Sequence, residues 1–133
     1  MSAYVVDASV VASYLAPDEV AAPGHAAILE GGAPLLAPWL IWAEFRNVLV
    51  VKVRRGRIEA GQVGTALAVF DALALALDTG PDGDRVLDLV HAHDLSVYDA
   101  LYLELATRRG APLLTLDRRL ARAAEAEGAA PGG

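Results

Sequence analysis

Short apolar runs alternate along this chain with longer segments of helical periodicity, and this alternation limits the fold more than any other feature. β-rich runs at 3–6, 34–37 and 112–116 have strand length, and between them apolar residues recur at helical spacing. Parallel strands need a crossover helix between them, and a parallel sheet needs helices over both faces. The order of elements therefore predicts an α/β fold, a three-layer α/β/α sandwich around a short, mostly parallel central sheet.

Capping and turn residues divide the helical part of the chain into separate helices. Ser9 is expected to cap the first helix, Pro23-Gly24 to weaken the second, and Pro38 to open the third. Residues 73–78 alternate in polarity, which fits either the end of a helix or a strand. We expect helices at 9–15, 18–30, 39–55, 59–73, 84–93, 97–109 and 117–127.

A length of 133 residues suits one domain, so residues 1–133 are expected to form a single domain with a frayed tail at 128–133. Hydrophobic residues make up 55% of the chain, which is enough for a core and argues against disorder. No stretch approaches ~18 uncharged apolar residues, and the first residues lack the basic region of a secretory signal. These features predict a cytoplasmic protein with no membrane segment.

The content of cysteine and histidine and the net charge exclude several kinds of chemistry. The chain has no cysteine, which excludes a disulfide scaffold, a thiol nucleophile and a cysteine-based zinc site. Three histidines make a histidine-rich metal site improbable. A formal net charge of −6 repels nucleic acid, so any nucleic-acid role needs a local basic patch or bound cations.

Four acidic residues occupy positions where a ligand site is expected. Asp7 and Asp117 directly follow predicted strands, and ligands of open parallel sheets bind beyond the carboxyl ends of the strands. Glu44 has apolar residues at five of its six helical neighbours three, four and seven positions away, which places it on a buried face. Asp99 also borders an apolar face, although Ser96 and Asp99 together fit a capping box.

Each acid alone also has an ordinary explanation, as a turn or cap residue or, for Glu44, as the partner of an arginine. If all four converge, the explanation changes, because two like charges ~4 Å apart repel by about 4 kcal/mol at an effective dielectric of about 20. Oxygen ligands without cysteine or histidine select Mg²⁺ or Mn²⁺. Such an ion activates water and stabilises charge on a phosphoryl oxygen, which suits phosphodiester hydrolysis.

Four short motifs occur in order over almost the whole chain: YVVDASV at 4–10, WAEFRNVL at 42–49, LSVYDALYLELA at 95–106 and PLLTLDRRLA at 112–121. Together they resemble the PIN-domain ribonucleases, and most closely the VapC-type toxins of bacterial toxin–antitoxin modules. The tail, EAEGAAPGG, contains no β-branched residue, so the final edge strand that many relatives have is expected to be vestigial or absent.

The resemblance implies a PIN-like sandwich in which Asp7, Glu44, Asp99 and Asp117 hold Mg²⁺ or Mn²⁺. Ser9, two positions after Asp7, would orient a ligand or metal-bound water. The resemblance further implies cleavage of structured RNA such as tRNA or rRNA, inhibition by a cognate VapB-like antitoxin, and a homodimer.

Basic residues gather after predicted elements despite the acidic total, and Arg118 and Arg119 are the best candidates for substrate binding because they follow Asp117. The leading hypothesis is a metal-dependent endoribonuclease, the toxin of a VapBC-type module. One alternative is a non-catalytic binding module whose acidic pocket receives an arginine of a partner. The other is an α/β phosphatase with Asp7 as nucleophile, although the second aspartate two residues on that such enzymes use is lacking.

Overall fold

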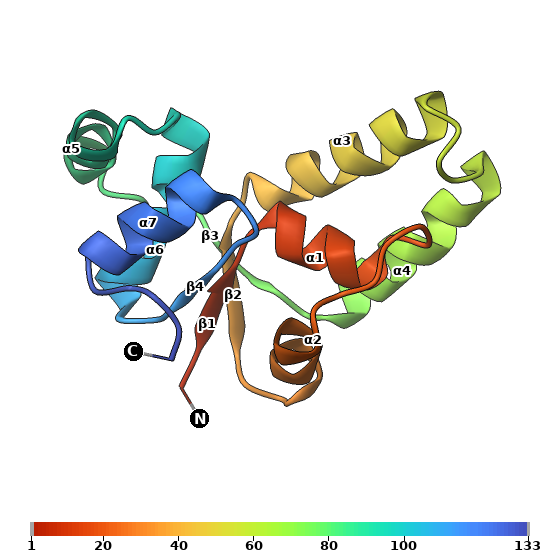
Figure 1. Ribbon diagram of the computed structural model, residues 1–133, viewed down its shortest axis with the longest axis horizontal. Helices are drawn as coiled ribbons and strands as arrows, with labels where there is room; N and C mark the ends of the chain where they lie inside the picture. The colour runs from red at the N-terminus through yellow and green to blue at the C-terminus, as the bar shows by residue number, and fades with distance from the viewer. Residues whose placement is uncertain (1, 133) are drawn as a thin grey trace.

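The computed structural model describes residues 2–132, which form one four-stranded parallel sheet in the order β3-β2-β1-β4 (Figure 1). The strands are β1 (Tyr4–Val6), β2 (Leu35–Pro38), β3 (Ala76–Asp78) and β4 (Leu113–Leu114). The helices are α1 (Ala8–Leu15), α2 (Pro23–Glu30), α3 (Ile41–Arg54), α4 (Val63–Ala72), α5 (Gly83–His93), α6 (Val97–Arg109) and α7 (Arg118–Ala126), with a 3₁₀ turn η1 (Ala60–Gln62) before α4.

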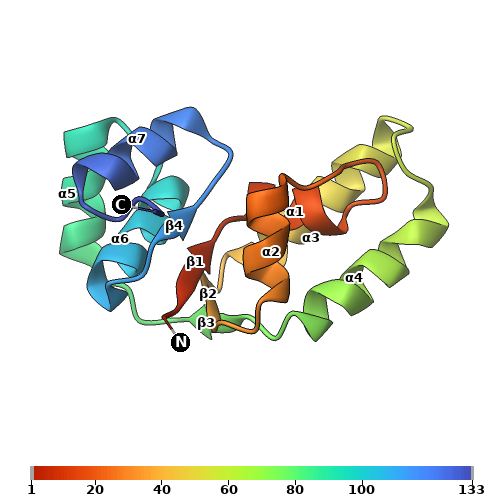
Figure 2. The ribbon, with the colours of Figure 1, turned by 60° about the horizontal axis from the view of Figure 1, so that its bottom comes forward.

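Helices cover both faces of the sheet. On one face α6 packs against β1 and β2, α7 packs against β4, and α5 packs against α6. On the other face α1 contacts α2, α3 and α4 (Figures 1 and 2). The predicted α/β/α sandwich with a parallel central sheet is therefore confirmed.

The hydrophobic core follows directly from this layering. Val5 and Val6 of β1 are fully buried because strands of a parallel sheet are covered on both faces. The apolar face of α3 contributes Phe45 and Leu49, and the ring of Phe45 stacks on Phe70 of α4 with centroids 4.8 Å apart. This contact fixes the direction of α3, which carries Glu44.

Three predicted boundaries at the start of the chain are wrong. Asp7, and not Ser9, is the N-cap of α1, and its carboxylate accepts from the backbone N–H of Val10. The helix expected at 18–30 begins only at Pro23, which occupies a first-turn position and so starts α2 instead of weakening it. Pro38 does not open α3 but ends β2, where it pairs with Asp78.

Elements later in the chain agree better with the prediction. Helix α6 has the predicted bounds, and the ambiguous stretch at 73–78 ends in a strand, β3. The predicted frayed tail is wrong at Ala129, which is buried and whose carbonyl accepts from the N–H of Leu113 at 2.8 Å. No strand follows α7 in the described part of the chain, and this one backbone bond lies at the edge of β4. None of the helices within residues 2–132 combines the length and apolar character needed to cross a bilayer.

A buried ion pair attaches the edge strand β3 to α6. Glu104 is 1% exposed, and both of its carboxylate oxygens accept from the guanidinium of Arg108, at 2.7 and 3.0 Å. The same guanidinium donates to both oxygens of Asp78, at 3.1 and 2.7 Å, and holds the pKa of Asp78 below its usual range. One arginine therefore bonds to two carboxylates that belong to different elements.

We predict that Arg108→Met lowers the free energy of unfolding by about 3 kcal/mol, because it leaves the charge of Glu104 buried without a partner. Urea denaturation followed by circular dichroism measures the change. Arg109→Met is the matched control, since this neighbouring arginine is exposed and makes no ion pair among residues 2–132, and its effect should stay within about 0.5 kcal/mol. Equal effects of the two substitutions would contradict the structural role of the ion pair.

Candidate active site

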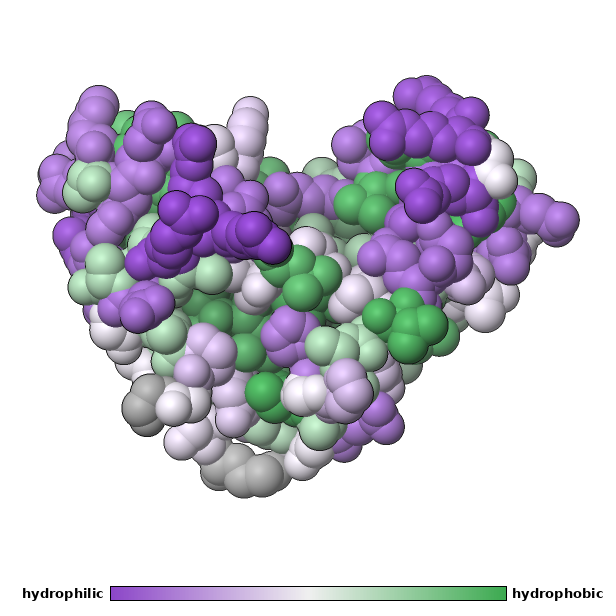
Figure 3. Space-filling view, in the orientation of Figure 1, coloured by the Kyte–Doolittle hydropathy of each residue, from purple (hydrophilic) through white to green (hydrophobic). Residues whose placement is uncertain are grey.

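The four predicted acids lie at or near the N-terminal ends of four helices. Asp7 and Asp117 cap α1 and α7, while Glu44 and Asp99 lie in the first turns of α3 and α6. Figure 3 shows the molecule hollowed between two lobes, and these helix ends border the hollow in the same view (Figure 1). The partial positive charge of a helix N-terminus stabilises a nearby carboxylate, so this arrangement suits an acidic site.

Asp7 is the most enclosed of the four carboxylates, at 7% exposed. Its Oδ1 accepts from the hydroxyl of Ser9 at 2.6 Å and from the N–H of Val10 at 3.1 Å, and its Oδ2 accepts from the hydroxyl of Thr115. Burial raises the pKa of Asp7, and these hydrogen bonds oppose the rise. The side chain is thus held in one orientation by Ser9 and Val10 of α1 and by Thr115, which directly follows β4.

Glu44 has its carboxylate bonded to Tyr102 of α6, whose hydroxyl donates to Oε1 at 2.6 Å. Burial raises the pKa of Glu44, the hydrogen bond from Tyr102 lowers it, and the charges of Asp99 and Asp7 raise it further. The alternative explanation of Glu44, a partner arginine, is not found in the described residues, and its hydrogen-bond partner is a buried tyrosine.

Asp99 is electrostatically coupled to each of the other three acids. Burial raises its pKa most, the charge of Asp117 raises it further, the nearby Ser96 hydroxyl lowers it, and the charge of Asp7 adds a smaller rise. The N–H of Asp99 donates to Ser96 Oγ at 3.0 Å, which is one half of the predicted capping box. Asp117 caps α7 through the N–H of Leu120 at 3.0 Å.

The four carboxylates lie near enough to affect one another electrostatically. The charges of Asp7 and Asp117 raise the pKa of Asp99, and the charges of Asp7 and Asp99 raise the pKa of Glu44. No lysine or arginine within residues 2–132 forms an ion pair with any of them. Hydrogen bonds from the protein therefore oppose the effect of burial and repulsion only in part, and no basic side chain of the described residues neutralises the charge. This is the situation in which a carboxylate cluster binds a hard divalent cation.

The convergence is looser than the sequence predicted. Within the described chain no three carboxylate or imidazole groups come together at ligand distance around one point. Mg²⁺ keeps several water molecules and needs only one or two carboxylates directly. The all-oxygen donor set at this edge of the sheet fits such an ion through a mixture of direct and water-bridged contacts.

The structure gives different surroundings to the residues that were predicted to support the site or to bind substrate. Ser9 lies in the site, where its Oγ donates to Asp7 and accepts from the N–H of Leu116 at 3.0 Å. Arg118 is exposed and follows Asp117 directly. Arg119 contacts Asp94, at 3.2 Å to the carbonyl and 3.3 Å to the carboxylate, so its guanidinium is held toward the end of α5.

Sequence reasoning missed two residues of the site, Thr115 and Tyr102. Thr115 donates to Asp7 and accepts from the N–H of Asp117, so it links two of the acids. The side chain of Tyr102 lies in the core, and its hydroxyl fixes Glu44. A hydroxyl two residues before Asp117 and a tyrosine one helical turn after Asp99 are the signals that were present.

Comparison with known proteins identifies the family of this chain. A family model described as the PIN domain matches residues 4–126. The chain is 37% identical over 132 residues to ribonuclease VapC1 of Mycobacterium tuberculosis, covering 92% of each chain. It is 32% identical over 120 residues to ribonuclease VapC3 of Pyrobaculum aerophilum, covering 88% of this chain and 91% of the relative.

The fold is similar to the crystal structure of PAE2754 from Pyrobaculum aerophilum, with a TM-score of 0.69 and 25% sequence identity over 92% of this chain and 79% of that one. The chain therefore belongs to the PIN domain family. The resemblance seen in the four sequence motifs, to PIN proteins and to those of the VapC type, is confirmed.

We predict that Asp7→Asn stabilises the metal-free protein at neutral pH. The raised pKa of Asp7 means that the folded state binds more protons than the unfolded state, so stability falls as pH rises from the usual aspartate value through the raised one. Asparagine removes this cost and still caps α1. Thermal unfolding in a chelating buffer should give a higher Tm at pH 7, with the gain shrinking toward about pH 4.

Asp71→Asn is the matched control for this measurement, because Asp71 is exposed on α4, and it should leave the Tm unchanged at both pH values. A lower Tm for Asp7→Asn at neutral pH would mean that the hydrogen bonds from Ser9 and Thr115 outweigh the burial of charge.

We also predict that Tyr102→Phe moves the acidic limb of the pH–activity profile to higher pH. The hydroxyl of Tyr102 lowers the pKa of Glu44, so its removal raises that pKa. Loss of such a supporting hydrogen bond should lower activity by about 10-fold. Tyr98→Phe, at a residue 60% exposed, is the control and should leave the profile in place. An unshifted limb for Tyr102→Phe would show that Glu44 does not govern it.

Proposed function

We propose that this protein is a metal-dependent endoribonuclease that hydrolyses RNA phosphodiester bonds, with Asp7, Glu44, Asp99 and Asp117 holding Mg²⁺ or Mn²⁺. It is a VapC-type PIN ribonuclease, the toxin of a VapBC module. The observation that carries the proposal of the site is the gathering of four carboxylates, coupled to one another and without a basic partner, at four helix N-termini.

The four acids take different parts in holding the ion. Asp7, Glu44 and Asp99 are the proposed direct or water-bridged ligands, because each has a raised pKa and carries part of the mutual repulsion. Asp117 is the proposed ligand of a second site or a supporting ligand. When bound, Mg²⁺ or Mn²⁺ supplies an activated water and stabilises charge on the phosphoryl oxygens.

The neighbouring hydroxyl groups orient the acids. Ser9 and Thr115 hold the two oxygens of Asp7, and Tyr102 holds one oxygen of Glu44, leaving the other free of a protein donor in the described residues. Such supporting hydrogen bonds fix ligand geometry before an ion arrives, so less reorganisation is needed on binding.

Substrate and partners follow from the type of protein. The curated relatives are named ribonucleases, which supports RNA as the substrate, and structured RNA such as tRNA or rRNA is the class we propose. A cognate VapB-like antitoxin is the proposed inhibitor, and a homodimer the proposed assembly. Arg118, exposed beside Asp117, is retained as a phosphate contact, and Arg119 is a weaker candidate because Asp94 already engages it.

Two other functions make different demands on Asp7. A phosphatase would use Asp7 as a nucleophile, but both of its oxygens already accept hydrogen bonds from hydroxyl groups. A non-catalytic module would need only an acidic pocket for an arginine of a partner. Calorimetry with Mn²⁺ on protein stripped of antitoxin separates that alternative, because a receptor for arginine needs no divalent ion.

We predict that Asp7→Asn lowers RNA cleavage by about 10³-fold while the fold is retained, because an essential charge at the ion is lost. Cleavage of total tRNA and rRNA by protein free of contaminating nuclease, in Mg²⁺ and again in Mn²⁺, measures the effect. Asp71→Asn serves again as the matched control and should cleave normally. Cleavage by Asp7→Asn at the rate of the unaltered protein would refute the site.

A further inference from the structure

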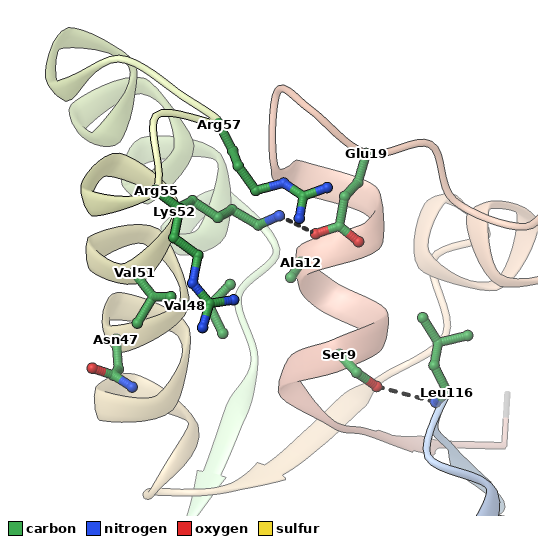
Figure 4. A pocket seen from close by; sticks show the side chains of 10 residues that line it. All are labelled: Ser9, Ala12, Glu19, Asn47, Val48, Val51, Lys52, Arg55, Arg57 and Leu116. Atoms are coloured by element: carbon green, nitrogen blue, oxygen red, sulfur yellow. Dashed lines mark hydrogen bonds and ion pairs between the residues drawn. The ribbon is translucent and has the colours of Figure 1, made fainter.

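A cavity of about 350 Å³ opens between α1 and α3, directly beside the carboxylate site (Figure 4). Ser9 forms one end of it, and the hydroxyl of Ser9 donates to Asp7, so this end is one hydrogen bond from the acids. Lys52, Arg55 and Arg57 form the other end. The cavity therefore joins the acidic site to a group of three cations.

The charges at the basic end are unequally neutralised. Lys52 pairs with Asp18 at 2.9 Å and with Glu19 at 2.7 Å, and Arg57 lies 3.4 Å from the same Asp18. Arg55 forms no ion pair and no side-chain hydrogen bond within residues 2–132. Three cations face two carboxylates, so the group keeps one net positive charge in a protein whose net charge is −6.

The backbone holds this basic end in a fixed position. Helix α3 ends in a Schellman motif, in which the N–H of Arg57 bonds to the carbonyl of Lys52 at 2.9 Å and the N–H of Gly56 bonds to that of Val53 at 3.0 Å. Gly56 has φ +69°, a conformation that glycine adopts without strain. Arg55 is the C-cap, and Figure 4 shows its side chain running along the cavity past Val48.

We infer that this cavity binds a backbone phosphate of the RNA next to the scissile one, with the guanidinium of Arg55 as its main ligand. The inference rests on the proposed function and adds a substrate subsite to it. The guanidinium of an arginine has paired N–H donors that match two oxygens of a phosphate. Because Arg55 has no ion-pair partner within residues 2–132, its donors are available for such a phosphate.

The residues that line the cavity suit the sugar–phosphate backbone of RNA better than they suit a base. Ala12, Val48 and Val51 form apolar walls that suit the face of a ribose, and Asn47 adds a polar group. No aromatic side chain is among the described residues that line the cavity, so it lacks the stacking surface by which proteins hold single-stranded bases. Its volume is within the ~300–1,000 Å³ range of small-ligand pockets, which is room for one sugar–phosphate unit.

The first test measures binding without cleavage. Asp7→Asn protein, with and without Arg55→Gln, is titrated against a fluorescent mixed-sequence single-stranded RNA at several salt concentrations. We expect Arg55→Gln to weaken binding about tenfold and to reduce the salt slope by about 0.7, the value for one phosphate contact on a single strand. Arg54→Gln is the matched control, because Arg54 is an exposed arginine of the same helix end that does not line the cavity.

The second test locates the phosphate. The probe is the shortest RNA that the unaltered protein cuts at one position, made with a neutral methylphosphonate at each neighbouring linkage in turn. One replacement should weaken binding to Asp7→Asn protein about tenfold and should have no further effect once Arg55 is glutamine. Additive losses at every linkage would overturn the inference.

The outcomes separate the subsite from the proposed function. Equal RNA binding by the Arg55→Gln and Arg54→Gln proteins overturns the subsite, even if the unaltered protein cleaves RNA. A loss of RNA binding that is specific to Arg55→Gln supports the subsite, even if no RNA is cleaved and the proposed function fails. If Arg55→Gln weakens only the binding of an acidic antitoxin peptide and leaves RNA binding unchanged, the cavity is a protein contact and the inference is wrong.

Discussion

Mutual repulsion between carboxylates is the constraint on which the rest of this structure depends. Burial raises the pKa of Asp7, Glu44 and Asp99, and the charges of neighbouring acids raise the pKa of Glu44 and Asp99 further. A fold selected only for stability would separate these groups or pair them with arginine, as it does for Glu104 and Arg108. The described residues therefore contain one acidic cluster that is paired with an arginine and one that has no basic partner.

The parallel sheet makes this concentration of charge possible. The carboxyl ends of β1 and β4 deliver Asp7 and Asp117 to one edge, and the crossover helices begin at the same edge. Each acid consequently meets the positive end of a helix dipole, which offsets part of the repulsion without providing a counterion. Hydroxyl groups from Ser9, Thr115 and Tyr102 offset a further part. The repulsion that remains favours the binding of a divalent ion.

The sequence predicted the features that depend on local signals and missed those that depend on distant contacts. The bounds of α6 were predicted correctly because Ser96 caps it and Gly110, at φ +61°, ends it. The end of β2 was misplaced because proline also suits the first turn of a helix. The pairing of Pro38 with Asp78 of β3 is a tertiary contact, which the local sequence does not reveal. Thr115 and Tyr102 bond to acids 108 and 58 residues away, so their position beside Asp117 and Asp99 marks them as near the site but does not identify the acid that each one bonds. The four acids were identifiable because several acids in strand-end or apolar contexts are collectively improbable, while their incomplete convergence depends on side-chain positions that sequence does not determine.

The neighbouring acidic and basic regions also bear on the size of the substrate. The acids lie on one side of Ser9, and the cavity that contains the unpaired side chain of Arg55 lies on the other side. A phosphate monoester carries its charge at a single point and can satisfy only one of these regions. A phosphodiester chain carries a charge at every linkage, so one phosphate can approach a cation held by the acids while its neighbour contacts the guanidinium. In a protein of net charge −6, which repels polyanions elsewhere, this pairing favours a polymer over a monoester and therefore a nuclease over a phosphatase.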